Sequence, residues 1–104
     1  MNQSYSKKNP VTFAAAVSAV VRNIPRGKAF SYGKVADLSG FHGAARAVGT
    51  LMKKNFDSSI PCHRVVYADG RVGPYNRGGT SSKEGLLKQE GVIIREGRVR
   101  TGKK

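Results

Sequence analysis

The chain is 104 residues long and carries 19 Lys and Arg residues against six Asp and Glu, a formal net charge of +13. At this length we expect one domain with a modest core, and no stretch approaches the ~20 consecutive apolar residues of a membrane span. A single cysteine excludes an internal disulfide, and the N-terminal segment MNQSYSKKNP lacks the apolar region of a signal peptide. These features together predict a cytoplasmic protein.

The positive charge is not confined to the two ends of the chain. Residues 10–94 still contain twelve Lys and Arg against five Asp and Glu, although the basic tails, about 1–9 and 95–104, could simply be solubilising. A basic folded body favours nucleic acid as the partner. An anionic membrane is the weaker choice, because no basic amphipathic helix stands out.

Three helices are predicted in the first half of the chain. Apolar residues at helical spacing predict a helix over residues 11–22. Ser31 is a suitable N-cap for a short helix, SYGKVADLS, which Gly40 ends, and a third helix is predicted over residues 44–54. Two short helices joined by a tight turn that contains glycine predict a helix-turn-helix.

The two faces of the third helix differ in character. A wheel places the apolar residues Ala44, Val48, Leu51 and Met52 on one stripe, and it places Arg46, Gly49, Thr50 and Lys53 nearly opposite. A helical glycine costs about 1 kcal/mol relative to alanine, which is easiest to explain if a partner must approach the backbone closely. The alternative is an ordinary solvated face that tolerates the glycine.

Short extended elements are predicted in the second half. Residues 60–67 are expected to be extended, residues 68–70 to form a hairpin turn, and residues 71–73 to be the return strand of a wing. Residues 92–100 are expected to form a basic strand pair that turns at Glu96 and Gly97.

A last helix is predicted between these strands. Ser81 or Ser82 could cap the segment SSKEGLLKQE, which Gly91 would end, although Gly85 interrupts the pattern. The predicted fold is mainly α with a small β wing, a single winged helix-turn-helix domain.

The only cysteine, Cys62, lies in the segment IPCHRVV. A lone cysteine is most often a small buried hydrophobic residue. Here Pro61 precedes it, and His63 and Arg64 place two potentially cationic groups after it, where they could favour the thiolate. The segment therefore leaves a structural and a reactive cysteine both open.

Four segments in order carry a resemblance: GKAFSYGKVADLSG, GAARAVGTLMKKN, IPCHRVV and VGPYNRGGTSSKEGLLKQEGV. They resemble successive blocks of the O6-alkylguanine-DNA alkyltransferase family over roughly residues 11–93. The resemblance implies DNA repair in which an alkylated guanine is flipped out of the duplex and the cysteine takes the alkyl group irreversibly. It implies neither a cofactor nor a metal.

The resemblance also implies catalytic roles. Cys62 would be the nucleophile, His63 would take its proton through a water molecule, and Glu90 would orient the imidazole. Tyr32 would donate a hydrogen bond to the leaving guanine, and Asn55 would brace the turn after the recognition helix. Judged from the residues alone, Tyr32 could almost equally be a core aromatic and His63 could be a surface strand residue. For Glu90, the residues alone favour a helix-end acid without a catalytic role.

Arg46 would be the arginine finger that fills the gap left by the flipped base, from a recognition helix in the minor groove. The DNA-binding residues implied by the resemblance are Arg46, Ala45, Gly49, Thr50, Lys53, Ser31 and Lys34. The base pocket would involve Val65, Tyr75, Asn76, Arg77 and Gly78. Either Asn76 or Arg77 would meet the guanine oxygen, because the loop PYNRGG looks one residue longer than is usual in the family.

Two alternatives stay open beside the transferase. One is an alkyltransferase-like protein that binds the lesion and flags it for another pathway; the other is a winged-helix regulator in which Cys62 is structural. We expect a monomeric single domain over residues 1–104, without the N-terminal domain common in the family. Its partner would be duplex DNA that contains O6-alkylguanine, with other repair proteins as further candidates and no membrane. It would lie at the nucleoid, or in the nucleus of a eukaryote.

Overall fold

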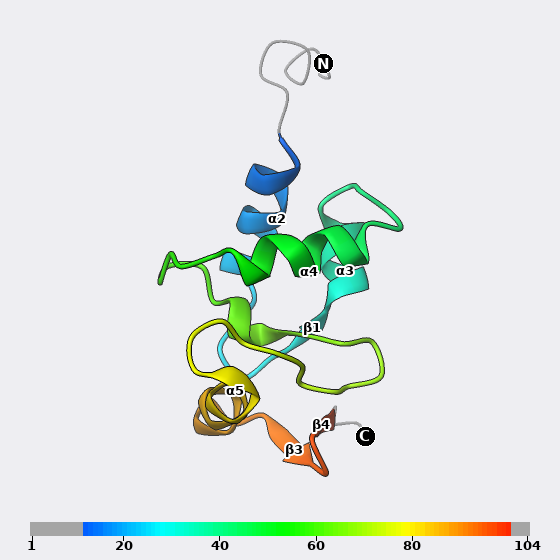
Figure 1. The fold of residues 1–104 in the computed structure, drawn as a ribbon. Coiled ribbons are helices and arrows are strands. Elements are labelled where there is room, and N and C mark those ends of the chain that lie inside the picture. Colours follow the sequence, from blue (N-terminus) through cyan, green and yellow to red (C-terminus); the bar gives the residue numbers. More distant parts are fainter. Residues whose placement is uncertain (1–11, 101–104) are drawn as a thin grey trace.

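A computed structural model describes residues 12–100, so the expected tail at residues 1–9 lies outside the described part (Figure 1). Its helices are α2 (Phe13–Arg22), α3 (Tyr32–Leu38), α4 (Ala45–Lys53) and α5 (Gly79–Gln89). Its strands are β1 (Phe30–Ser31), β2 (Val65–Val66), β3 (Ile93–Arg95) and β4 (Arg98–Arg100). This mainly helical architecture with small sheets confirms the predicted fold class. No helix within residues 12–100 is long and apolar enough to cross a membrane.

Side-chain caps set where the first helices begin. The Thr12 hydroxyl accepts a hydrogen bond of 3.1 Å from the Ala15 backbone N–H at the start of α2. The Ser31 hydroxyl accepts one of 3.0 Å from the Lys34 N–H at the start of α3, so the predicted Ser31 cap is confirmed.

Glycines form the turn between α3 and α4. Gly40 and Gly43 have φ angles of 88° and 82°, which non-glycine residues rarely adopt. The Phe41 ring then meets the Phe13 ring edge-on at 5.0 Å, which ties the turn to α2. Val48 and Met52 of α4 are buried, as the helical wheel predicted.

The prediction that residues 60–67 are extended is wrong at its centre. Cys62–Arg64 form a turn of 3₁₀ helix, which the Arg64 N–H closes by donating to the Pro61 carbonyl at 2.9 Å. The chain becomes extended only at Val65–Val66, which pair in parallel with Phe30–Ser31. Cys62 and His63 therefore do not alternate across a strand.

Strand β2 lies between two apolar clusters. Val65 belongs to a cluster with residues of α2, α3 and α4, whereas Val66 packs with Val72, Leu87 and Val92. Neighbouring residues of a strand face opposite sides, so one short strand connects both clusters.

The predicted turn at residues 68–70 is present, but the predicted return strand is not. The Gly70 N–H donates to the Tyr67 carbonyl at 2.9 Å, and Arg71 forms a single bridge with Arg98 of β4. The local pattern did not show this long-range partner. The β3–β4 pair and its turn at Glu96 and Gly97 are confirmed, with φ angles of 54° and 75° at the turn.

Helix α5 begins earlier than predicted. Gly78 is its N-cap at φ 118° and the helix starts at Gly79, so Ser81 and Ser82 lie inside it rather than capping it. Glycine adopts this backbone conformation without the steric cost that a side chain imposes, which allows the early start.

The hairpin is part of the fold rather than a tail, because Ile94 and Val99 pack on the second apolar cluster. We predict that a chain ending at Ile94 is less stable than the full chain by about 2 kcal/mol, from lost apolar burial. A chain ending at Arg100 retains every described contact and is the control. Thermal melts compare the three chains, and equal melting temperatures would contradict the packing role of the hairpin.

Candidate active site

Cys62 lies in the wall of a cavity of about 160 Å³. Its side chain is largely buried, with 5% of the residue exposed. The cavity is lined by Tyr32, Gly49, Met52, Lys53, Cys62, Pro74, Tyr75, Asn76 and Lys83. Cys62 thus lines a partly open space together with residues of α3, α4 and α5, and we call this space the Cys62 cavity.

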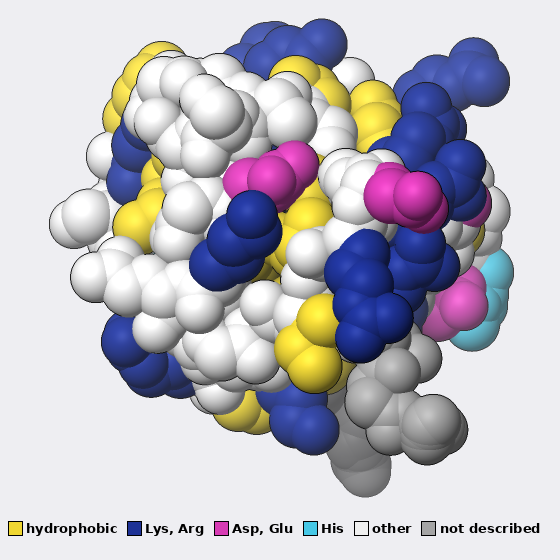
Figure 2. All heavy atoms as spheres, turned by 90° about the horizontal axis from the view of Figure 1, so that it is seen from below, with side chains coloured by type: hydrophobic (Ala, Val, Ile, Leu, Met, Phe, Trp, Pro, Cys, Tyr) yellow, Lys and Arg dark blue, Asp and Glu magenta, His cyan; other side chains and the backbone are white. Residues whose placement is uncertain are grey.

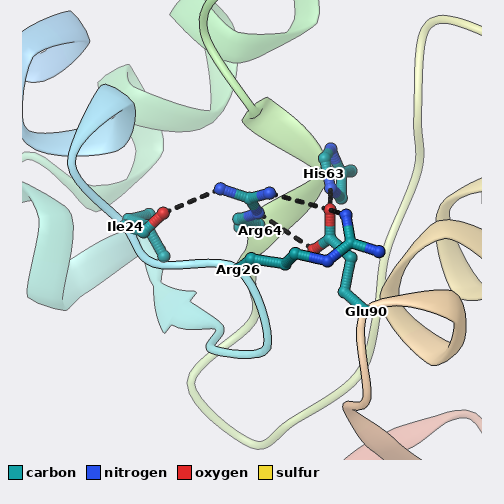
Figure 3. Close-up of polar contacts among 5 residues, drawn as sticks. All are labelled: Ile24, Arg26, His63, Arg64 and Glu90. Atoms are coloured by element: carbon teal, nitrogen blue, oxygen red, sulfur yellow. Dashed lines mark hydrogen bonds and ion pairs between the residues drawn. The ribbon is translucent and has the colours of Figure 1, made fainter.

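Glu90, at the C-terminal end of α5, accepts hydrogen bonds from both residues that follow Cys62 (Figure 3). His63 Nε2 lies 2.9 Å from Glu90 Oε2, and Arg64 donates from Nε and Nη2 to the two carboxylate oxygens at 2.9 and 2.8 Å. Arg64 Nη1 also donates to the Ile24 carbonyl at 2.8 Å. One carboxylate thus orients the imidazole and anchors the turn that carries the cysteine.

The electrostatics of this cluster favour charged Glu90. Burial opposes ionisation, but the hydrogen bonds from Arg64 and His63 outweigh it and lower the pKa of Glu90 to about 2. The hydrogen bonds from Arg64 to Glu90 also raise the pKa of the Arg64 guanidinium, against the opposing effect of burial. Arg26 lies 3.9 Å away with 66% of its side chain exposed, so its contribution is small.

Cys62 and His63 are neighbours in the 3₁₀ turn. Within residues 12–100, no hydrogen bond joins the thiol to the imidazole. Because Nε2 of His63 faces Glu90, Nδ1 is the nitrogen left to accept a proton. That His63 takes the Cys62 proton through a water stays a prediction from the family resemblance.

Lys83 is a site residue that the sequence analysis missed. It is 1% exposed, and its Nζ donates to the Tyr32 hydroxyl and the Pro74 carbonyl, each at 3.3 Å. Burial lowers the pKa of Lys83 to about 8, although the nearby Cys62 opposes this shift. Burial, together with Tyr67 and Cys62, raises the pKa of Tyr32 to about 12.

A second hollow, of about 200 Å³, lies on the outer face of α4, and we call it the outer hollow. It is lined by Tyr32, Ala45, Arg46, Gly49, Thr50, Lys53, Tyr67 and Pro74. Gly49 borders both spaces, and a Cβ added there would lie 3.9 Å from the Tyr32 ring, an ordinary contact. The fold therefore does not itself require glycine at this position.

Ser31 and Lys34, two of the predicted DNA-binding residues, line neither space. The Ser31 hydroxyl is engaged as the cap of α3, and Lys34 Nζ lies 4.3 Å above the Phe30 ring. Their roles stay predictions.

The predicted base-pocket residues divide into two groups. Tyr75 and Asn76 line the Cys62 cavity, whereas Val65, Arg77 and Gly78 do not. Asn76 Nδ2 donates to the Lys53 and Asn55 carbonyls, both at 2.7 Å, and thereby ties the loop to the end of α4. This placement favours Asn76 over Arg77 as the residue nearer a bound base.

Asn55 braces the turn between α4 and the cysteine segment. Its Nδ2 donates to the Ile60 carbonyl at 3.2 Å, and its Oδ1 accepts from the Asp57 N–H at 3.0 Å. This geometry agrees with the hinge role that the resemblance implies.

Within residues 12–100, no group of three or more His, Cys, Asp or Glu residues could hold a metal ion.

The part of the chain that contains Cys62, His63 and Glu90 is similar to known proteins. Residues 12–92 match the family described as 6-O-methylguanine DNA methyltransferase, DNA binding domain. The chain belongs to this family. A relative from Mus musculus, named methylated-DNA--protein-cysteine methyltransferase, is 49% identical over 67 residues, which are 64% of this chain and 32% of that protein. The chain thus matches about a third of the length of this member.

Two solved structures are similar to this chain in sequence and in fold. Mycobacterium tuberculosis OGT in complex with DNA is 42% identical with a TM-score of 0.71, covering 75% of this chain and 48% of that one. Schizosaccharomyces pombe Atl1, in complex with DNA containing O6-carboxymethylguanine, is 30% identical with a TM-score of 0.73, covering 85% and 86%. The chain therefore covers most of the Atl1 chain but about half of the OGT chain.

The Glu90 cluster predicts how stability depends on pH. Because the folded-state pKa of Glu90 lies below its ordinary value of 4.5, its stabilisation is present above that value and is lost as pH falls toward 2. We predict that Glu90→Gln lowers the melting temperature at pH 7, where Arg64 loses its charged partner, and flattens the fall in stability between pH 5 and about 2.

Glu84→Gln, on the same helix, is the control for this prediction, since among the described residues Glu84 pairs only with Lys88, at 3.6 Å. Its melting temperature should follow that of the unmodified chain across the pH range. If Glu90→Gln follows it as well, Glu90 does not stabilise the site.

Proposed function

We propose that this chain repairs DNA by transferring an alkyl group from the O6 atom of guanine in a duplex to its own Cys62. The observation that carries the proposal is that one cavity brings together the thiol of Cys62, the Tyr32 hydroxyl and the ammonium group of Lys83. This cavity supplies a nucleophile and hydrogen-bond donors for a leaving group. The His63–Glu90 pair supplies a base beside the cysteine.

The transfer begins with the loss of the thiol proton. His63 accepts it through a water at Nδ1, and the Glu90 carboxylate stabilises the imidazolium that forms. The thiolate then attacks the alkyl carbon in line with the carbon–O6 bond. The S–C bond forms as the C–O6 bond breaks, and that electron pair passes to the guanine. The thioether has no route back to the thiol, so each molecule acts once.

The departing guanine takes up a proton to become neutral. Tyr32, whose raised pKa keeps its hydroxyl protonated, donates toward the purine ring. Lys83 donates to the Tyr32 oxygen and makes the phenol a better proton donor, and its ammonium group can return the proton. In this scheme the charged form of Lys83 assists departure of the base.

Access to the cavity requires that the base leaves the stack. The outer face of α4 presents Arg46 and Lys53 beside the small residues Ala45 and Gly49, which suits close approach to a DNA groove. Arg46 takes the place of the flipped base in the duplex, as the family resemblance implies. The protein acts on duplex DNA as a monomer.

A lesion-binding protein without transfer activity is the second candidate. Its support is that Atl1, which is 30% identical to this chain with a TM-score of 0.73, was solved in complex with DNA containing O6-carboxymethylguanine. The free thiol at position 62, in the wall of the cavity, favours transfer instead.

Intact-mass measurement separates the two candidates. After incubation with a duplex that contains O6-methylguanine, we predict the gain of one methyl group per protein molecule, located on Cys62 and never released. Cys62→Ala should gain none and should still bind the lesion duplex. A chain that binds the lesion duplex while its mass stays unchanged is a lesion-binding protein.

Lys83 gives a prediction that depends on pH. Its pKa of about 8 means that the assisting ammonium is lost as pH rises through that value. We predict that Lys83→Met slows methyl transfer at pH 7 by at least about tenfold, and that the rate ratio of wild type to variant falls above pH 8.

Methionine fills the same buried space without a charge, so the Lys83→Met variant should fold. Lys88→Met, at an exposed position of the same helix, is the control and should transfer at the wild-type rate. A rate ratio that stays constant from pH 6.5 to 9.5 would show that the Lys83 charge does not take part.

A further inference from the structure

Four exposed arginines lie on one face of the β3–β4 hairpin and the loop beside it. Arg98 pairs directly with Arg95 in the hairpin register and with Arg71 in the bridge, and directly paired residues share a face. Arg100 lies two residues beyond Arg98 on the same strand and therefore on the same face. We call this surface the arginine face: Arg71, Arg95, Arg98 and Arg100.

This arrangement is unfavourable for the isolated protein. Like charges placed directly opposite one another destabilise a sheet. Asp69 partly compensates, with Oδ2 2.8 Å from Arg71 Nε and 3.8 Å from Arg98 Nη1. Glu96 lies 3.6 Å from Arg100 but is 89% exposed, so this pair contributes little. Positive charge therefore remains in excess, and a polyanion would complete the compensation.

The opposite face of the hairpin fixes the arginine face in place. Ile94 and Val99 pack on the second apolar cluster, and the backbone N–H of Val99 donates to the Gly70 carbonyl at 2.7 Å. The N–H of Val72 donates to the Gly97 carbonyl at 3.2 Å. The arginines thus project from a packed sheet and not from a free tail.

Tyr67 connects this surface to the outer hollow. Its ring lies 5.5 Å from the Tyr32 ring, and the Arg71 guanidinium lies 4.7 Å above it. Tyr67 lines the outer hollow with Arg46 and Lys53, and it also borders a second depression with Arg71 and Arg98. In Figure 1 the yellow-green loop after β2 lies between α4 and the hairpin.

Figure 2 views the molecule from the side of α5 and the hairpin. Lys and Arg side chains gather right of centre, with acidic side chains among them. In Figure 1, β4 also lies on the right of the molecule.

We propose that the arginine face is a second contact for duplex DNA, which binds backbone phosphates beyond those that α4 reaches. This inference rests on the proposed function, since it assigns a further surface to the same duplex. The hairpin that carries three of the four arginines follows residue 92, where the family match ends. The contact would strengthen and orient binding without reading the base, because phosphates carry no sequence information.

Salt dependence of binding tests the contact. The double variant Arg95→Gln/Arg98→Gln removes two charges but keeps part of each side-chain stem. For an undamaged duplex, the slope of log K against log salt should become less steep by about 1.8, at about 0.9 per phosphate, with affinity more than tenfold weaker at 0.1 M salt. The matched control is Arg22→Gln/Lys28→Gln, which has the same net charge as the first double variant. It changes exposed residues that line neither the outer hollow nor the depression beside Arg71 and Arg98. Fluorescence anisotropy gives the affinities, and thermal melts must show that both variants are folded.

A third variant should act in the opposite direction. Asp69→Asn removes the carboxylate charge that competes for Arg71 and Arg98, yet its amide oxygen can still accept from the Arg71 N–H. We expect tighter duplex binding and a steeper slope. Equal slopes for the two double variants, or weaker duplex binding by Asp69→Asn, would contradict the proposal that the arginine face binds DNA. The proposed function would remain supported in that case if the wild-type chain still binds the duplex and accepts the methyl group. A wild-type chain that binds no duplex would overturn both.

Discussion

The buried carboxylate of Glu90 is the contact on which the arrangement of the site depends. It joins the end of α5 to the turn that carries Cys62, and Arg64 extends the connection to the Ile24 carbonyl after α2. A buried charge without a partner is costly, so removing the carboxylate, the guanidinium or the imidazole would destabilise the groups that remain. Because α5 is fixed at this end, Lys83, two helical turns earlier, is held against the Cys62 cavity. The same contact that stabilises the fold therefore orients the proposed base and the proposed donor.

Local signals made the helix-turn-helix predictable. A serine cap at Ser31 and glycine at positions 40 and 43 determine backbone conformation through neighbouring atoms alone. The errors arose where contacts with distant residues decide or hold the structure, and the turn at Cys62–Arg64 is held by the hydrogen bonds from the Arg64 side chain to Glu90, 26 residues away. Arg71 pairs with Arg98, 27 residues away, rather than with β2, and the bend that Pro61 introduces becomes a turn of 3₁₀ helix closed by Arg64. The stability of such elements comes from tertiary contacts, which a local pattern does not contain.

Site residues were predictable where they are adjacent in the sequence and form a short motif, as at Cys62 and His63. The pairing of His63 with Glu90 came from the family resemblance, because the residue pattern alone favoured a helix-end acid. Lys83 was missed, although a signal existed: it lies four residues before the buried Leu87, so its charge falls on the apolar face of α5. A lysine at such a position must find partners in the interior, and the Tyr32 hydroxyl is one.

In the proposed mechanism, a flipped base in the Cys62 cavity meets the thiol on one side and the Tyr32–Lys83 pair on the other. A crystal structure of the Cys62→Ala chain bound to a duplex with O6-methylguanine tests it most directly. We predict that the base lies outside the helical stack and in the cavity, with its methyl carbon directed at the Cβ of residue 62 and its ring within hydrogen-bonding distance of the Tyr32 hydroxyl. A base that stays stacked in the duplex, or one that lies in the cavity with its methyl group directed away from residue 62, would contradict the proposed mechanism.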